Sequence, residues 1–195
     1  MVESVEWKAP SVKEASSAAA LTALGIEVFV EPARLADFDA MAVELARIGA
    51  AAKIRTGGVT RDAFPSPRQV LAFLRSCIRA GLRFKATAGL HHAVRGEYRL
   101  TYEPVPPTGE MFGFLNIAMA AALLWSGRSE DAVLRALEEH SADAFEFSEG
   151  GVDWRGEQLT RRELEEFRAR FFAGFGSCSF SEPMAEVGLE PLPRA

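Results

Sequence analysis

Short apolar runs alternate with stretches of helical periodicity along the first 90 residues. The runs have the length and bulk of buried strands, and they occupy residues 4–9, 26–32, 51–58 and 82–89. Between them, apolar residues recur at intervals of three and four, as at Leu35, Phe38, Met41, Leu45 and Ile48. Each helical stretch ends at a glycine, namely Gly25, Gly49 or Gly81. Strands separated by single helices predict a parallel α/β sheet covered by helices.

Helix start signals support these boundaries. Ser11 with Glu14, Ser66 with Gln69 and Thr160 with Glu163 have the spacing of a capping box, in which the side chains of the N-cap and N3 residues satisfy orphan backbone amides. Pro67 adds a first-turn proline to the second of these. We expect helices over 11–25, 35–49, 66–81 and 160–172.

The pattern is interrupted after residue 90. Residues 91–109 contain three prolines and a short hairpin pattern around "EYRLTYEP", so we expect a long loop over the strand-end face. Helices at 111–125 and 129–140 and a strand at 144–148 follow. A hairpin through Gly150 and Gly151 leads into 152–156, and the helix from Thr160 holds Phe167, Phe171 and Phe172. The tail is irregular, with one turn after Ser181.

About five strand-helix units are therefore predicted. Residues 1–90 hold three of them, and residues 110–195 hold the remaining units and the tail, so that residues 1–195 form a single α/β domain. A complete (β/α) barrel has eight units in about 250 residues. We expect an incomplete, TIM-barrel-like fold whose open edge either is covered or pairs with another copy, as in a homodimer.

Composition narrows the class of protein. The chain has 195 residues, of which 48% are hydrophobic and 25% charged, which is typical of a globular protein. A net charge of −5 without a basic cluster argues against a nucleic-acid partner. The apolar run at 111–125 is too short to span a bilayer, so no membrane association is expected. With no leader pattern and two cysteines taken as free thiols, Cys77 and Cys178, we expect a cytoplasmic protein.

Charged residues lie where the predicted strands end, which is the ligand-binding edge of parallel α/β folds. These strand ends present Lys8, Glu31, Lys53 with Arg55, Lys85 with Thr87, and Glu146 or Ser148. A single lysine there is usually paired or extended into solvent. Three lysines on neighbouring strands repel one another, and this favours either an anionic ligand or an amine whose pKa is lowered for nucleophilic attack.

Two of these strand ends carry a family resemblance. "KIRTGG" at Lys53 and "FKATAGLHH" at Lys85, 32 positions apart, resemble consecutive motifs of deoxyribose-phosphate aldolase and related class I aldolases. The resemblance implies a Schiff-base lysine at Lys53, whose pKa Lys85 lowers. It also implies close backbone approach to a ligand at Gly57, Gly58 and Gly89. Arg55 and the His91-His92 pair depart from the family motifs.

Two adjacent histidines follow the second motif. No third histidine or cysteine stands at a ligand spacing from His91 and His92, so no metal is predicted. We expect His91 to be an acid-base group at the mouth, or alternatively a cap of the loop, and His92 to contact the ligand.

Three hypotheses follow. In the first, a lyase-type enzyme without a cofactor attacks a small carbonyl compound bearing phosphate or carboxylate through Lys53, with Lys85 and Arg55 supplying positive potential. Glu31 or His91 moves protons, and Lys8, Thr56 and Thr87 complete the ligand site. In the second, the same cationic mouth binds a small anionic metabolite without catalysis. In the third, the chain is a barrel fragment that acts through association, and its lysines are paired with Glu31 and Glu146.

Overall fold

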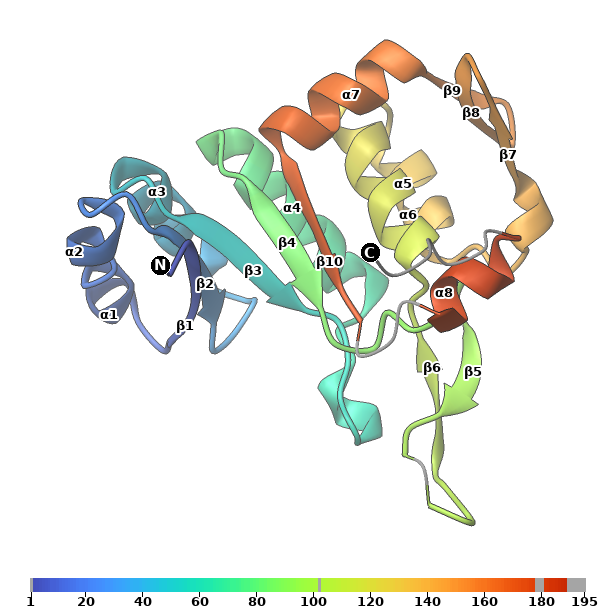
Figure 1. Cartoon of the computed structure of the whole chain (residues 1–195), viewed down its shortest axis with the longest axis horizontal. Coiled ribbons are helices and arrows are strands. Elements are labelled where there is room, and N and C mark those ends of the chain that lie inside the picture. The colour runs from blue at the N-terminus through green and yellow to red at the C-terminus, as the bar shows by residue number, and fades with distance from the viewer. Residues whose placement is uncertain (1, 102, 178–180, 189–195) are drawn as a thin grey trace.

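The computed structural model describes residues 2–101, 103–177 and 181–188, and its centre is a five-stranded parallel sheet. The strand order is β1 (Ser4–Ala9), β2 (Glu27–Pro32), β3 (Ala51–Arg55), β4 (Phe84–Thr87) and β10 (Phe172–Gly176) (Figure 1). All four pairings are parallel, which confirms the predicted α/β class. The sheet is open, with β1 and β10 at its edges.

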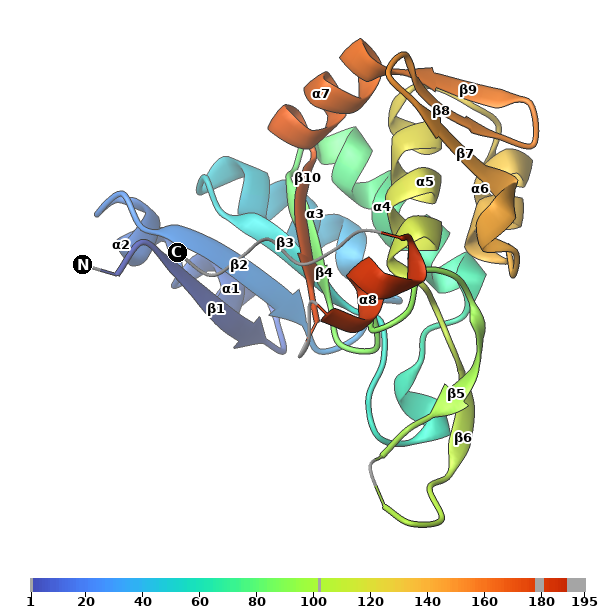
Figure 2. The same cartoon turned by 45° about the vertical axis from the view of Figure 1, so that its right-hand side comes forward.

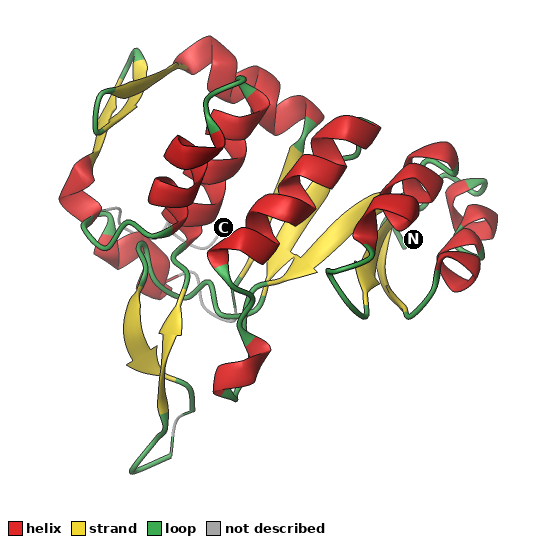
Figure 3. Cartoon of the chain, turned by 180° about the vertical axis from the view of Figure 1, so that it is seen from behind, coloured by secondary structure: helices red, strands yellow, loops and turns green. Residues whose placement is uncertain are grey.

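Four helices join the first four strands and cover one face of the sheet. They are α1 (Val12–Ser16), α2 (Ala19–Thr22), α3 (Phe38–Arg47) and α4 (Pro67–Ala80). Figure 3, which views the molecule from behind, shows these helices on the same side of the strands. Apolar strand residues such as Val30, Ile54 and Phe84 are fully buried in the core. Phe73 of α4 contacts both Phe38 of α3, at 4.7 Å between ring centroids, and Phe84 of β4.

Several predicted helix boundaries agree with the local geometry, but the helix predicted over 11–25 is divided into α1 and α2, and Ser11 caps α1 by accepting from the Glu14 amide without the reciprocal bond in the described structure. Ser66 and Thr160 each form a reciprocal capping box, with Gln69 and Glu163 respectively. Gly81 adopts a left-handed conformation with φ 63° at the end of α4, a conformation that costs an L-residue free energy and that glycine adopts freely. These helix boundaries are therefore confirmed.

Within its described residues, the second half of the chain adds two antiparallel sheets and four more helices. The segment after β4 contains a hairpin of β5 (Gly96–Arg99) and β6 (Thr108–Met111), which projects from the end of the molecule at which β3 and β4 end (Figure 1). Helices α5 (Phe114–Trp125) and α6 (Glu130–Leu137) follow, then β7 (Phe145–Ser148), β8 (Gly151–Trp154) and β9 (Glu157–Thr160), and finally α7 (Arg161–Arg170) and α8 (Ser181–Glu186). Short 3₁₀ helices occur at Arg61–Ala63 and Ala142–Ala144. Figure 2 shows the three-stranded sheet beside α5, α6 and α7, at the end of the molecule opposite β1.

The fifth parallel strand is not the one that the sequence pattern predicts. The strand at 144–148 belongs to the antiparallel sheet, where it pairs with β8 through the predicted Gly150-Gly151 hairpin. The parallel strand is β10, which starts at Phe172, a residue predicted to be helical. Helix α7 ends at Arg170, and Gly174 at φ 149° suits an extended strand with a bulge better than a helix.

Two further findings bear on the expected class of protein. Within the described residues, every helix is too short or too polar to cross a membrane. Cys77 is a buried free thiol in α4, whereas Cys178 lies outside the described residues.

Candidate functional site

The strand register aligns charged residues in one row across the sheet. Lys8 of β1 pairs with Glu31 of β2, and Lys53 of β3 pairs with Lys85 of β4. Side chains alternate between the faces of a strand, so these four residues project from the face opposite the connecting helices. The structure therefore brings the two predicted lysines together on one face.

A glutamate two residues before Lys8 joins the two lysines. Glu6 accepts a hydrogen bond from Lys53 Nζ, and its other oxygen lies 2.6 Å from Lys85 Nζ. Lys53 Nζ also lies 2.9 Å from Glu31 Oε2, and Glu31 Oε1 lies 3.3 Å from Arg55 Nε. We call Glu6, Glu31, Lys53, Arg55 and Lys85 the lysine cluster.

The environment of Lys53 favours its charged form. The side chain is 9% exposed, and burial alone would lower the pKa of its amine, but hydrogen bonds to Glu6 and Glu31 outweigh burial and raise that pKa. Burial likewise opposes ionisation of both glutamates, yet their lysine partners lower the pKa of each carboxyl. The pKa of Lys53 is thus shifted in the direction opposite to the one that a Schiff-base amine needs.

Lys85 is held by an aromatic ring as well as by Glu6. Its Nζ lies 4.2 Å from the centroid of the Phe29 ring, on the face of the sheet that carries the lysine cluster. The cluster is therefore a set of fixed ion pairs with three cations and two anions.

A polar pocket of about 380 Å³ lies where β1, β2 and β3 end. We call it the strand-end pocket; its charged lining residues are Lys8, Glu31, Arg34, Arg55 and Asp62. Apolar atoms complete the lining, including those of Leu35, Phe64 and Pro65. Among the described residues, Lys8 and Arg34 have no ion-pair partner. Asp62 likewise has no ion-pair partner in the described part of the chain, so the pocket presents two unpaired cations and one unpaired anion.

The predicted ligand-binding loop residues serve mainly to pack the loops after β3 and β4. Thr56 is fully buried, and its hydroxyl donates to the carbonyl of Ala88 at 2.6 Å. A Cβ on Gly57 would lie 3.0 Å from Gly89 Cα and 2.6 Å from the Phe64 ring. One on Gly58 would lie 2.7 Å from Ala63 Cβ. The glycines permit close approach to the backbone, as expected. However, the groups that approach it are other residues of the protein and not a ligand.

Thr87 is adjacent to Arg55 at the end of β4. Its hydroxyl is buried and has no hydrogen-bond partner in the described structure. Thr87, Thr56, Gly57, Gly58 and Gly89 do not line the strand-end pocket, whereas the predicted residues Lys8, Glu31 and Arg55 do.

The histidines connect the segment after β4 to the C-terminal segment. His91 Nδ1 lies 3.0 Å from Ser177 Oγ, just after β10. His92 Nδ1 lies 2.6 Å from Glu186 Oε1 of α8, and its ring stacks on Tyr98 at 3.5 Å between centroids. In the described parts of the chain, no three or more histidine, cysteine, aspartate or glutamate residues are grouped so as to hold a metal ion.

Sequence reasoning misplaced two residues, Glu146 and Ser148, which both lie in the antiparallel strand β7, and missed three. Glu146 lies in β7, opposite Asp153 of β8, and not at a parallel strand end. Glu6, Arg34 and Asp62 were missed, although Glu6 stands two positions before Lys8 and must therefore share its face. Arg34 follows directly after the end of β2. The third hypothesis named Glu31 and Glu146 as the partners of the lysines. The structure shows that Lys53 pairs with Glu31 and with Glu6, so Glu6 takes the place of Glu146.

Comparisons of the chain with protein-family models, with curated proteins and with solved structures found no significant match.

Proposed function

We propose that the strand-end pocket binds a small anionic metabolite. The observation that carries the proposal is the charge balance of the pocket. Lys8 and Arg34 have no ion-pair partner within the described structure, and Arg55 forms its ion pair there with Glu31, which Lys53 also contacts. Asp62 is unpaired there as well and offsets one of these charges, so three cations and two anions leave the described lining with a net positive charge. An anion in the pocket would gain these cations without breaking an ion pair of the lysine cluster.

The pocket also suits the size and chemistry of such a ligand. Its volume of about 380 Å³ lies at the lower end of the range of small-molecule sites, which is roughly 300–1,000 Å³. Guanidinium groups from Arg34 and Arg55 bind carboxylate or phosphate with paired hydrogen bonds. The apolar side of the pocket, at Leu35 and Phe64, would contact the carbon skeleton.

Thermal unfolding and calorimetry with inorganic phosphate, pyruvate and glyceraldehyde 3-phosphate test this proposal. At least one of these anions should raise the Tm, and Lys8→Ala and Arg34→Ala should each weaken its binding about tenfold, as expected for one charged hydrogen bond. Lys13→Ala is the control, because Lys13 is an exposed lysine of α1 outside the pocket. If the Lys8→Ala/Arg34→Ala double variant binds the anion as tightly as the wild-type protein does, the proposal is rejected.

A second candidate is lyase chemistry through Lys53, and the side-by-side placement of Lys53 and Lys85 favours it. In the Schiff-base step, the deprotonated amine adds to a carbonyl carbon and water leaves. The reaction requires that Lys53 first lose a proton, and Glu31 at 2.9 Å is the group placed to accept it. The raised pKa of Lys53 opposes this step, so we rank it below simple binding.

Borohydride trapping separates the two candidates. The protein is reduced in the presence of pyruvate or glyceraldehyde 3-phosphate, and the modified lysine is located by mass spectrometry. A reduced adduct on Lys53 supports the lyase. Binding without an adduct on Lys53 leaves anion binding as the function.

The arrangement of the sheet supports a barrel-like origin and association. Sequential strand order with the connecting helices on one face is the arrangement of a (β/α) barrel, and we propose that the sheet is an incomplete one. We further propose that the edge of β1 pairs with a second copy, in the cytoplasm, where thiols such as Cys77 stay reduced. Sedimentation velocity over a range of concentrations tests the dimer, and a monomer throughout contradicts it.

A further inference from the structure

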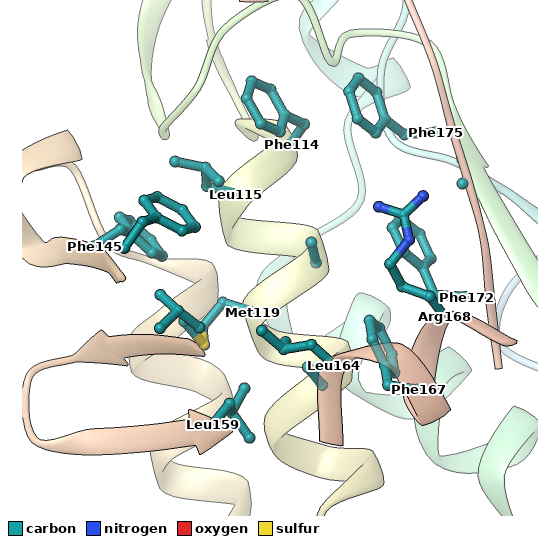
Figure 4. Close-up of a pocket in the computed structure, with 15 residues that line it drawn as sticks. Phe114, Leu115, Met119, Phe145, Leu159, Leu164, Phe167, Arg168, Phe172 and Phe175 are labelled. Carbon is teal, nitrogen blue, oxygen red and sulfur yellow. The ribbon is translucent and has the colours of Figure 1, made fainter. Parts of the chain in front are cut away.

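A second pocket, of about 410 Å³, lies between β10, α5, α7 and the three-stranded sheet (Figure 4). It shares no lining residue with the strand-end pocket. Fourteen of its fifteen lining residues are apolar or glycine, and the exception is Arg168 of α7. The site is therefore chemically different from the one proposed above, and an inference about it stands independently.

Helices α5 and α7, strand β10 and the three-stranded sheet form the walls of this apolar pocket, and α7 contributes Leu164 and Phe167. Helix α5 contributes Leu115, Ala118 and Met119, the antiparallel sheet contributes Val152 and Leu159, and β10 contributes Phe175. The Phe175 ring stacks on Phe114 of α5 at 4.9 Å and 7°, which fixes the spacing between β10 and α5. Because packed elements on several sides form the walls, the cavity does not depend on one mobile side chain.

Apolar surface remains open to water at the edge of the pocket. Phe147 of β7 is 64% exposed although it is a large hydrophobic residue, and Leu115 and Leu164 are partly exposed. Covering this surface with a hydrocarbon removes apolar area from water, which is favourable. The walls thus favour an apolar chain or ring as the occupant.

Arg168 supplies the one charge, and it has no ion-pair partner within the described structure. Two other arginines of the same helix do form ion pairs: Arg161 with Glu165 and Arg162 with Glu166, each one turn later. In the view of Figure 4, the Arg168 side chain extends along β10 toward Phe175. An unneutralised guanidinium at an otherwise apolar pocket is complementary to a carboxylate carried on an apolar chain.

We propose that this pocket binds an amphiphilic carboxylate, such as a medium-chain fatty acid. The chain lies between α5 and the three-stranded sheet, and the carboxylate pairs with Arg168 at the rim.

Calorimetry with decanoate and decanol, both below their aggregation limits, tests the proposal. Decanoate should bind the full chain with 1:1 stoichiometry, and each methylene between hexanoate and decanoate should tighten binding about three- to fourfold. Arg168→Ala should weaken decanoate binding tenfold or more and leave decanol binding unchanged. Arg170→Ala, an exposed arginine of the same helix outside the pocket, is the matched control and should behave as wild type.

A second variant tests the position of the chain. Ala118→Phe places a ring inside the pocket and should abolish binding of both decanoate and decanol. If Ala118→Phe fails to fold, the Arg168→Ala measurements still test the proposal. Decanoate binding that is unchanged in Arg168→Ala, or equal in Arg168→Ala and Arg170→Ala, would overturn the proposal. So would a wild-type protein that binds neither ligand but forms a dimer that Phe147→Asp dissociates, since the face would then be a self-association surface.

Discussion

Lys53 and Lys85 lie opposite each other on adjacent strands, and their amines contact different oxygens of the carboxylate of Glu6. Two lysines at this register would repel each other without a shared counter-charge. Their arrangement is stable because β1, two strands away from β3 in the sheet, supplies that counter-charge. The cluster therefore ties together strands that share no backbone hydrogen bonds.

Replacing Glu6 tests this shared role. Glu6→Gln removes the counter-charge of Lys85 and one of the two of Lys53, so the free energy of unfolding should fall by about 1 kcal/mol. The loss is small because the Glu6 side chain is 46% exposed and water screens its interactions. Urea unfolding at pH 7 measures the change. Glu3→Gln, an exposed change with no ion pair in the described structure, is the control and should have no effect.

The two lysines should differ in their contribution to stability. Lys53→Met leaves Glu31 buried with only Arg55, so the free energy of unfolding should fall by about 2–3 kcal/mol, less than for a buried charge left wholly unpaired. Lys85→Met should lower the free energy of unfolding by about 1 kcal/mol or less. The loss is smaller because its partner Glu6 is half exposed and still forms an ion pair with Lys53. Urea unfolding ranks the variants, and a larger loss for Lys85→Met would contradict this account of the cluster.

The parts of the fold that local patterns encode were predictable. Helix boundaries at Gly81, Ser66 and Thr160 follow from the backbone conformation of glycine and from capping bonds three residues apart. The strand β10 was not predictable in this way, because Phe171 and Phe172 fit both the stripe of a helix and the start of a strand. Its pairing with β4 spans nearly ninety residues and leaves no local signal.

The candidate site was predictable to a similar extent. The strand-end rule placed Lys53 and Lys85 on one face, since strand alternation and parallel register are simple geometry. It did not reveal that Glu6 lies close enough to pair with both lysines, because this contact joins residues 47 positions apart. The direction of the Lys53 pKa shift depends on that contact, so the chemistry of the site was beyond the reach of motif spacing.

The close approach of Gly57 and Gly89 should be sensitive to a single methyl group. Gly89→Ala places a Cβ about 3.1 Å from Gly57 Cα at a residue with φ 76°, so strain and crowding both act. Gly25→Ala is a matched control, because Gly25 has φ 77° and nothing within 4 Å of the added Cβ. We expect Gly25→Ala to cost about 1–2 kcal/mol for the left-handed backbone alone and Gly89→Ala to cost more.

The same pair of variants links the loop to the proposed ligand. A Cβ on Gly89 would also lie 3.3 Å from the Phe64 ring, which lines the strand-end pocket. Gly89→Ala should therefore weaken anion binding, measured by calorimetry, whereas Gly25→Ala should not. Equal losses of stability in Gly89→Ala and Gly25→Ala would contradict this expectation, because the loops after β3 and β4 would then have moved apart to accommodate the added methyl group.

A buried glutamate predicts how stability depends on pH. Glu139 accepts hydrogen bonds from Arg155 Nε at 2.6 Å and Trp154 Nε1 at 3.1 Å, and chiefly the Arg155 contact lowers its pKa to about 2. An unfolded glutamate has a pKa of about 4.3, so the stabilisation is complete above that pH and is lost as the pH falls toward 2. From this difference, Glu139 contributes at most about 3 kcal/mol at neutral pH.

Glu139→Gln should therefore destabilise the protein by about 1–3 kcal/mol at pH 7 and by much less near pH 2.5, where the wild-type residue has lost most of this stabilisation. Urea unfolding at both pH values measures the difference. Glu165→Gln, which removes an exposed pair between successive turns of α7, is the control and should change stability by less than about 0.5 kcal/mol at either pH. An equal loss for Glu139→Gln at both pH values would contradict the role of its ionised form, because hydrogen bonds to a neutral side chain would then account for the whole effect.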